Sequence, residues 1–229
     1  MMKRPAIIAA NWKMNGDLSL INTMTSGLKS LTLAENVNIV VCPSSPYLAA
    51  FSAQAKNDQL NENIQLGAQN VSEHLSGAYT GEISTTMLQE LSVKFVIVGH
   101  SERRSLYNET NALVAKKVKA TLEAGLTPIL CIGESEEQRV SAQTETVLSA
   151  QLQAVVDELG IEKFEDVVIA YEPVWAIGTG KTASPEMAQE THQFIRQFLT
   201  KASELSSDVD VADKVPLLYG GSVNAANCD

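Results

Sequence analysis

The fold is decided by the stretch Val167-Val168-Ile169-Ala170-Tyr171-Glu172-Pro173-Val174-Trp175-Ala176-Ile177-Gly178-Thr179-Gly180-Lys181. It opens with an apolar run of strand length, and one carboxylate, Glu172, follows that run. Pro173 then ends strand pairing because proline has no backbone N–H. The Gly-Thr-Gly tip between bulkier residues predicts a mobile flap with stiff ends. A carboxylate at the end of a buried strand, beside such a flap, is a candidate general base.

The rest of the chain repeats this pattern of a short apolar run followed by a longer amphipathic segment. Most runs are rich in Val, Ile and Leu without polar alternation, which is typical of parallel strands buried on both faces. The predicted strands are Ala6–Ala10, Val37–Cys42, Ile64–Ala68, Phe95–Val98, Thr127–Ile132, Val167–Tyr171 and Pro216–Tyr219.

Helical periodicity occupies the segments between several of these runs. It predicts a helix from Leu18 to Leu31 capped by Asp17, and a helix from Pro185 to Leu199 capped by Ser184. It also predicts helices over Leu106–Ala124, with Lys116, Lys117 and Lys119 on the outer face, and over Glu136–Leu159.

Strict alternation of strands and helices predicts a parallel sheet with helices outside, either an open doubly wound sheet or a closed (β/α)8 barrel. No G-x-G-x-x-G or G-x-x-x-x-G-K-[ST] motif follows the first strand, which weakens the nucleotide-binding open sheet. Polar residues follow most strands, and a barrel would bring them together at one mouth. We therefore predict a single barrel domain over residues 1–229, with the eighth βα unit missing from this sequence.

Composition limits the function classes. Hydrophobic residues make up 45% and charged residues 19% of the 229 residues, as in ordinary globular proteins. The net charge of −10 argues against binding to nucleic acid or to an anionic membrane surface. No apolar run approaches the roughly 18 residues of a membrane span, and the N-terminal run is too short for a signal peptide. The three cysteines form no CxxC pair, so neither a disulfide framework nor a zinc site is expected, and a reducing compartment fits.

Five sequence blocks carry a family resemblance. They are N-W-K-M-N-G at 11–16, V-G-H-S-E-R-R at 98–104, C-I-G-E at 131–134, A-Y-E-P-V-W-A-I-G-T-G-K at 170–181 and Y-G-G-S-V at 219–223. In this order and at this spacing they resemble the signature blocks of the triosephosphate isomerase family. The resemblance implies a TIM-barrel isomerase of glycolysis and gluconeogenesis that works in the cytoplasm with no metal and no cofactor. Its substrates would be dihydroxyacetone phosphate and D-glyceraldehyde 3-phosphate, interconverted through an enediolate.

The resemblance also implies the catalytic residues. Glu172 is similar to the general base, and His100 to the neutral electrophile that hydrogen-bonds the substrate oxygens. Lys13, with Asn11 beside it, is similar to the cation that offsets the charge of the phosphate and the enediolate. A strand-end Glu paired with a lysine, a core histidine and a surface lysine are the structural alternatives for Glu172, His100 and Lys13.

Supporting and phosphate-binding residues follow from the same resemblance. Ser101 and Glu102 support the site, with Glu102 as the partner of Lys13, and Gly178 and Ser222 join Asn11 and Lys13 at the phosphate. The family adds a second Gly-Gly after the eighth strand, which is absent from this sequence. The flap, with hinges at 174–175 and 181–183, comprises Pro173, Val174, Trp175, Ala176, Ile177, Gly178, Thr179, Gly180 and Lys181.

The segment Gln69–Glu82 is long for a βα connection, and such loops are usually functional. In the family it plugs into a second subunit, with the residue at Thr80 reaching furthest, so we expect a C2 homodimer. Cys131 is interpreted as a buried structural residue, and Glu134 as a flap-hinge or helix-cap partner. His74 and His192 are assigned no chemistry.

Two rival functions remain open at this point. One is another sugar-phosphate barrel enzyme, such as an aldolase that forms a Schiff base on Lys13. The other is a catalytically impaired, truncated barrel that acts as a binding or scaffold subunit.

Overall fold

The computed structural model describes residues 4–206 and 210–223. These residues form two compact units. The first unit consists of residues 4–98 and 119–128, and the second unit consists of the other described residues. The prediction of one domain over residues 1–229 stays a prediction.

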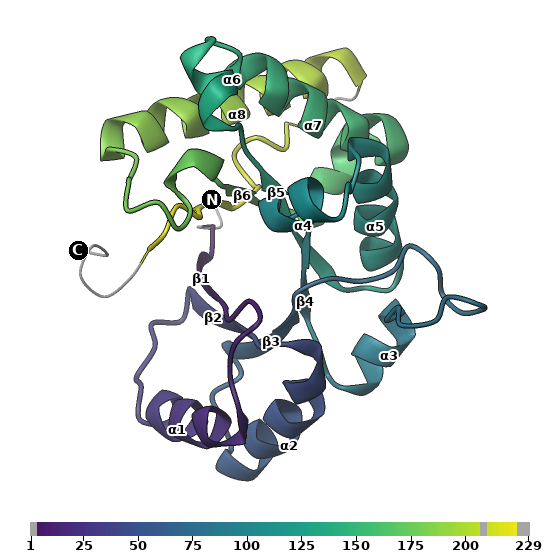
Figure 1. Ribbon diagram of the computed structural model, residues 1–229, viewed down its shortest axis with the longest axis vertical. Helices are drawn as coiled ribbons and strands as arrows, with labels where there is room; N and C mark the ends of the chain where they lie inside the picture. The colour runs from purple at the N-terminus through teal and green to yellow at the C-terminus, as the bar shows by residue number, and fades with distance from the viewer. Residues whose placement is uncertain (1–3, 207–209, 224–229) are drawn as a thin grey trace. The chain divides into compact units, whose positions relative to one another are not determined.

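The first unit contains the N-terminal strands and their helices (Figure 1). Strands β1 and β2 are parallel, with Asn11 aligned to Cys42, and β2 and β3 are parallel, with Val41 aligned to Leu66. Helices α1 and α2 pack against each other. In chain order the elements are β1 (Ala6–Asn11), α1 (Leu18–Lys29), β2 (Val37–Cys42), η1 (Ser45–Tyr47), α2 (Leu48–Asp58), β3 (Ile64–Ala68), α3 (Thr85–Glu90) and β4 (Phe95–Val98).

The second unit holds most of the remaining elements, although α5 ends and β5 begins in the first unit. Strands β5, β6 and β7 are parallel neighbours, and Tyr171 is aligned with both Ile132 and Tyr219. The elements are α4 (Ser101–Leu106), α5 (Asn111–Glu123), β5 (Thr127–Ile132), α6 (Glu136–Val140), α7 (Thr144–Leu159), η2 (Ile161–Asp166), β6 (Val168–Tyr171), η3 (Val174–Ala176), α8 (Pro185–Ser206) and β7 (Leu217–Tyr219).

Strand order in the sheet follows chain order from β1 to β7. An open doubly wound sheet would reverse its order at a switch point, so the sequential order identifies the (β/α)8-barrel class. The predicted strands are confirmed with boundary shifts: β1 extends to Asn11, and β6 and β7 each begin one residue late. The described residues contain seven strands, and an eighth βα unit is not among them.

Helix boundaries differ more from the sequence predictions. The predicted helix Leu106–Ala124 begins only at Asn111, because the Thr110 hydroxyl accepts the Leu113 N–H at 3.2 Å and starts a new helix there. The predicted helix over Glu136–Leu159 is two helices, broken where Ala142 adopts a φ of +55°. The caps at Asp17 and Ser184 are confirmed by bonds from the backbone N–H groups of Leu20 and Met187.

A buried ion cluster joins the α4–α5 connection to α5. The Glu109 Oε1 atom accepts hydrogen bonds from Lys117 Nζ and Arg103 Nε, both at 2.6 Å. The prediction that Lys117 lies on the outer face is wrong, since it is only 3% exposed, and the Glu109 carboxylate accounts for its burial. Desolvation acts to raise the pKa of Glu109, but the hydrogen bonds from Lys117 and Arg103 outweigh it and lower the pKa.

We predict that Glu109→Gln lowers the free energy of unfolding by about 3–5 kcal/mol at neutral pH, because it leaves the Lys117 ammonium buried without its carboxylate. Urea unfolding followed by circular dichroism measures this. A carboxyl with a lowered folded-state pKa stabilises above its unfolded-state pKa and loses this effect as pH falls, so the difference from wild type should narrow in acid. Exposed Glu90→Gln is the control, expected within about 0.5 kcal/mol of wild type. An equal effect of both changes would contradict the prediction.

Candidate active site

The Glu172 carboxylate is buried at the end of β6, with an exposed fraction of 6%. Its Oε2 atom accepts the backbone N–H of Ser101 at 3.1 Å, and its Oε1 atom lies 3.3 Å from Nε2 of His100. The backbone of Glu172 is also fixed, because its N–H donates to the Ile132 carbonyl of β5 at 2.7 Å. The turn from β4 to α4 therefore supplies both partners of the carboxylate.

The surroundings of His100 select one tautomer of its ring. Nδ1 accepts the Glu102 backbone N–H at 3.2 Å, as the N-cap of α4. The Glu102 carboxylate lies 3.7 Å from the same nitrogen, which is too far for a hydrogen bond. Because Nδ1 is an acceptor, the proton of the neutral ring sits on Nε2, which faces Glu172.

The N-terminal hinge of the flap is tied to a buried carboxylate, Glu134. Its Oε1 atom accepts hydrogen bonds from Trp175 Nε1 at 2.9 Å, Tyr171 Oη at 3.1 Å and Arg139 Nη1 at 3.1 Å. The Arg139 guanidinium also lies over the Trp175 ring, 5.1 Å from its centroid. Burial and the Glu134 charge raise the pKa of Tyr171. Glu134 thus contacts the hinge, whereas Ser135 is the residue that caps α6.

The flap tip contacts the segment after β7. The Gly178 N–H donates to Ser222 Oγ at 3.0 Å, and that hydroxyl donates to the Ala176 carbonyl at 2.8 Å. Gly178 and Gly180 have φ values of +69° and +77°, which glycine adopts without strain. The structure therefore brings together the two second-unit residues predicted at the phosphate, Gly178 and Ser222.

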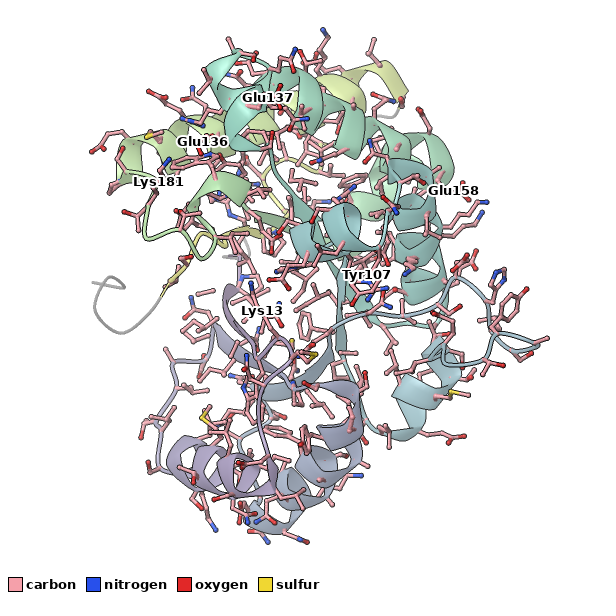
Figure 2. The ribbon with its side chains drawn as sticks, in the orientation of Figure 1. Lys13, Tyr107, Glu136, Glu137, Glu158 and Lys181 are labelled. Carbon is pink, nitrogen blue, oxygen red and sulfur yellow. The ribbon has the colours of Figure 1, made fainter. Side chains whose placement is uncertain are left out.

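The C-terminal hinge is held by two further contacts. The Ala183 N–H donates to Tyr219 Oη at 3.2 Å. The Lys181 ammonium pairs with Glu136 at the start of α6, and Figure 2 shows these two side chains next to each other. Both ends of the flap segment are thus attached to residues 134–136, and its C-terminal end is also attached to Tyr219.

Asn11 and Lys13 belong to the first unit, where two polar side chains hydrogen-bond to their turn. Lys13 has a φ of +54°, a strained value for a residue with a side chain, and its N–H donates to Asn11 Oδ1 at 2.9 Å. Its carbonyl accepts Ser44 Oγ at 2.8 Å and Gln69 Nε2 at 2.9 Å. Sequence reasoning missed Ser44 and gave no role to Gln69, although both are polar residues soon after predicted strands. The prediction that Glu102 pairs with Lys13 stays a prediction.

Two glycines that the sequence analysis did not single out are packed against Glu172. A Cβ atom on Gly133 would lie 1.8 Å from the Glu172 carbonyl oxygen, and one on Gly220 would lie 3.1 Å from Glu172 Cγ. Their signal in the sequence is glycine directly after strands β5 and β7. A cavity of about 260 Å³ lies in the same region, and its lining includes Glu172, Arg104 and Cys131.

Cys131 and His192 each contact a backbone carbonyl outside the carboxylate–imidazole pair. Cys131 is buried in β5, and its Sγ lies 3.9 Å from the Ile129 carbonyl oxygen. His192, on α8, contacts the Leu218 carbonyl, and burial lowers its pKa. Among residues 4–206 and 210–223, no cluster of three or more His, Cys, Asp or Glu residues could hold a metal ion. No helix in this part of the chain is long and apolar enough to cross a membrane.

The fold and the site together define a parallel-barrel enzyme that carries a buried carboxylate–imidazole pair at the carboxyl ends of its strands. The sequence profile described as triosephosphate isomerase matches residues 6–229. A triosephosphate isomerase of Colwellia psychrerythraea is 67% identical over 100% of this chain and 87% of the relative. Those of Alcanivorax borkumensis and Halorhodospira halophila are 49% and 50% identical, over 99% and 98% of this chain and 87% and 86% of the relatives. The chain belongs to the triosephosphate isomerase family.

We predict that Gly133→Ala lowers kcat on the order of 10²-fold, because the added methyl group displaces the Glu172 backbone from its place on β5. Steady-state assays on protein shown to be folded by circular dichroism measure the loss. Gly27→Ala in α1 is the matched control, since its Cβ meets nothing within 4 Å and kcat should stay within about threefold of wild type. Wild-type turnover in Gly133→Ala would show that the close contact does not position the base.

Proposed function

We propose that this protein interconverts dihydroxyacetone phosphate and D-glyceraldehyde 3-phosphate by proton transfer through an enediolate. The observation that carries the proposal is the buried Glu172 carboxylate, 3.3 Å from Nε2 of His100, whose Nδ1 accepts the Glu102 backbone N–H. A carboxylate can take a proton from the carbon beside a carbonyl, and a neutral imidazole can donate a hydrogen bond to the oxygen on which charge develops.

The reaction uses one base and one electrophile, which act in successive steps. Glu172 removes the proton from the substrate carbon, and the C–H electron pair forms the enediolate C=C bond as charge moves to the carbonyl oxygen. His100 stabilises that oxygen through Nε2–H and shuttles a proton between the two substrate oxygens. Glu172 then returns its proton to the neighbouring carbon. To reach the substrate, the Glu172 carboxylate leaves the Ser101 N–H that holds it at rest.

Phosphate binding is assigned to the flap tip, with Lys13 and Asn11 as the cation and the neutral donor. Support comes from the Gly178–Ser222 contact, which places a glycine amide and a hydroxyl together. A bound phosphate oxygen would accept from both once they release one another. Closure of the flap over the site excludes water, which protects the enediolate from losing its phosphate.

The cellular setting follows the proposed reaction. We place the protein in glycolysis and gluconeogenesis in the cytoplasm, acting without a metal or cofactor. The buried, neutral state of Cys42, whose pKa is raised to about 12 by burial, fits a thiol that is not used in chemistry.

We predict that Glu172→Asp lowers kcat on the order of 10²-fold, because the shorter side chain withdraws the carboxylate by about 1 Å from the reacting carbon. A coupled spectrophotometric assay in both directions measures the change. The same substitution at exposed Glu90, on α3, should leave kcat within about threefold. Turnover of Glu172→Asp close to wild type would rule out Glu172 as the base.

A homodimer through the Gln69–Glu82 loop is the proposed assembly. The loop is closed by a bond from the Ser72 N–H to the Ile83 carbonyl at 2.8 Å, and the His74 and Tyr79 rings stack with centroids 3.9 Å apart. Leu75 and Tyr79 are nonetheless 60% and 44% exposed. Ordered but exposed apolar side chains are typical of a surface that a partner covers.

We predict that Thr80→Asp shifts the protein from dimer to monomer, since it places a charge in the proposed interface. Sedimentation velocity over a range of protein concentrations measures the shift. The same change at exposed Thr23, on α1, should leave the dimer intact. A wild-type protein that sediments as a monomer would contradict the proposed assembly.

A further inference from the structure

The Arg104 guanidinium connects the ends of two neighbouring strands. Its Nε donates to the Gly99 carbonyl at 2.7 Å, directly after β4, and its Nη2 donates to the Cys131 carbonyl in β5 at 3.1 Å. Its Nη1 donates to Asn111 Oδ1 at 2.7 Å, at the start of α5. Three nitrogens of one planar group therefore bind three acceptors on three elements.

The Gly99 and Cys131 carbonyls are close in sequence to His100 and to the residue that hydrogen-bonds the Glu172 backbone. Gly99 O belongs to the peptide that precedes His100. Cys131 O belongs to the peptide that precedes Ile132, whose carbonyl accepts the Glu172 N–H at 2.7 Å. Arg104 thus joins the backbone that carries the imidazole to the backbone that supports the carboxylate.

The packing around Arg104 leaves little room for another geometry. Gly99 has a φ of +72°, and a Cβ atom there would lie 3.0 Å from Arg104 Nη2 and 2.9 Å from a Val114 methyl group. Burial lowers the pKa of Arg104, while the Glu172 and Glu109 carboxylates act to raise it, and a guanidinium remains protonated at neutral pH. The cation is therefore permanent and close to the base.

We propose that Arg104 is a positioning residue for the isomerisation, which sets the distance between His100 and Glu172 through the backbone without touching the substrate. The expected effect of Arg104 on kcat rests on the proposed function. Its effect on the placement of His100 relative to Glu172 does not. Lysine cannot replace arginine here, because a single ammonium nitrogen lacks the fixed fork that reaches three separate acceptors.

The experiment compares Arg104→Lys with Arg103→Lys, the same change at the next position of α4. Arg103 bonds to Glu109 and lies over the Tyr107 ring. We expect Arg104→Lys to lower kcat about 10- to 100-fold with KM within about threefold, and Arg103→Lys to leave both within about threefold. In histidine-labelled protein, the Nε2–H resonance of His100 should shift in Arg104→Lys and stay in place in Arg103→Lys.

A second variant, Arg104→Ala, tests the same role in case Arg104→Lys is poorly folded. In Arg104→Ala, millimolar guanidinium chloride should restore kcat at least tenfold, whereas sodium chloride at the same ionic strength should not. A kcat of Arg104→Lys within threefold of wild type, or an unshifted His100 resonance, would overturn the proposal. So would losses that follow the unfolded fraction measured by circular dichroism. If wild type lacked isomerase activity, the proposed function would fail, and a His100 resonance shifted only by the Arg104 change would still support the positioning role.

Discussion

The second unit depends on keeping an ionisable carboxylate out of water. An ionised carboxylate is costly to bury unless its oxygens are hydrogen-bonded, and Glu172 meets this requirement through one turn of chain, at Ser101 and His100. The turn that carries His100 and Ser101 follows β4, and Glu172 follows β6. Strand β5 lies between these two strands and therefore sets the distance between the turn and the carboxylate. The glycine after β5, Gly133, is required by the same arrangement, because any side chain there would meet the Glu172 carbonyl.

The proposed flap is held mainly by individual hydrogen bonds, and we propose that breaking them allows it to move. Its contacts at Glu134, Ser222 and Tyr219 are individual hydrogen bonds, each with a net contribution of about 1 kcal/mol. Breaking a few of them costs far less than the unfolding free energy of a domain. In the proposed flap motion, the Glu134 carboxylate would keep its hydrogen bonds from Tyr171 and Arg139 when Trp175 leaves.

The sequence predicts the features that depend on local pattern. Apolar runs located the strands within one residue, and Asp17 and Ser184 marked helix starts because capping is a short-range interaction. Helix α2 was missed because Leu48 and Phe51 are its only large apolar residues, so its periodicity is faint. The break at Ala142 and the burial of Lys117 have no local signal. The first needs a left-handed residue that is not glycine, and the second needs a carboxylate eight positions earlier. The same limit explains why Gln69 was given no role, because its amide donates to the carbonyls of Lys13 and Cys42, which lie 56 and 27 residues away.

The tautomer of His100 illustrates how the secondary structure determines the chemistry. The Glu102 N–H at the start of α4 needs an acceptor, and Nδ1 of His100 is that acceptor. Protonation of Nδ1 would remove the acceptor and place a positive charge at the positive end of a helix. The N-cap and the proposed electrophile are therefore the same imidazole, and the hydrogen bond that begins the helix also directs the Nε2 proton toward Glu172. In the proposed mechanism, the base and the neutral donor face each other across the substrate only while that cap is intact, so a change in the β4–α4 turn would change the reaction.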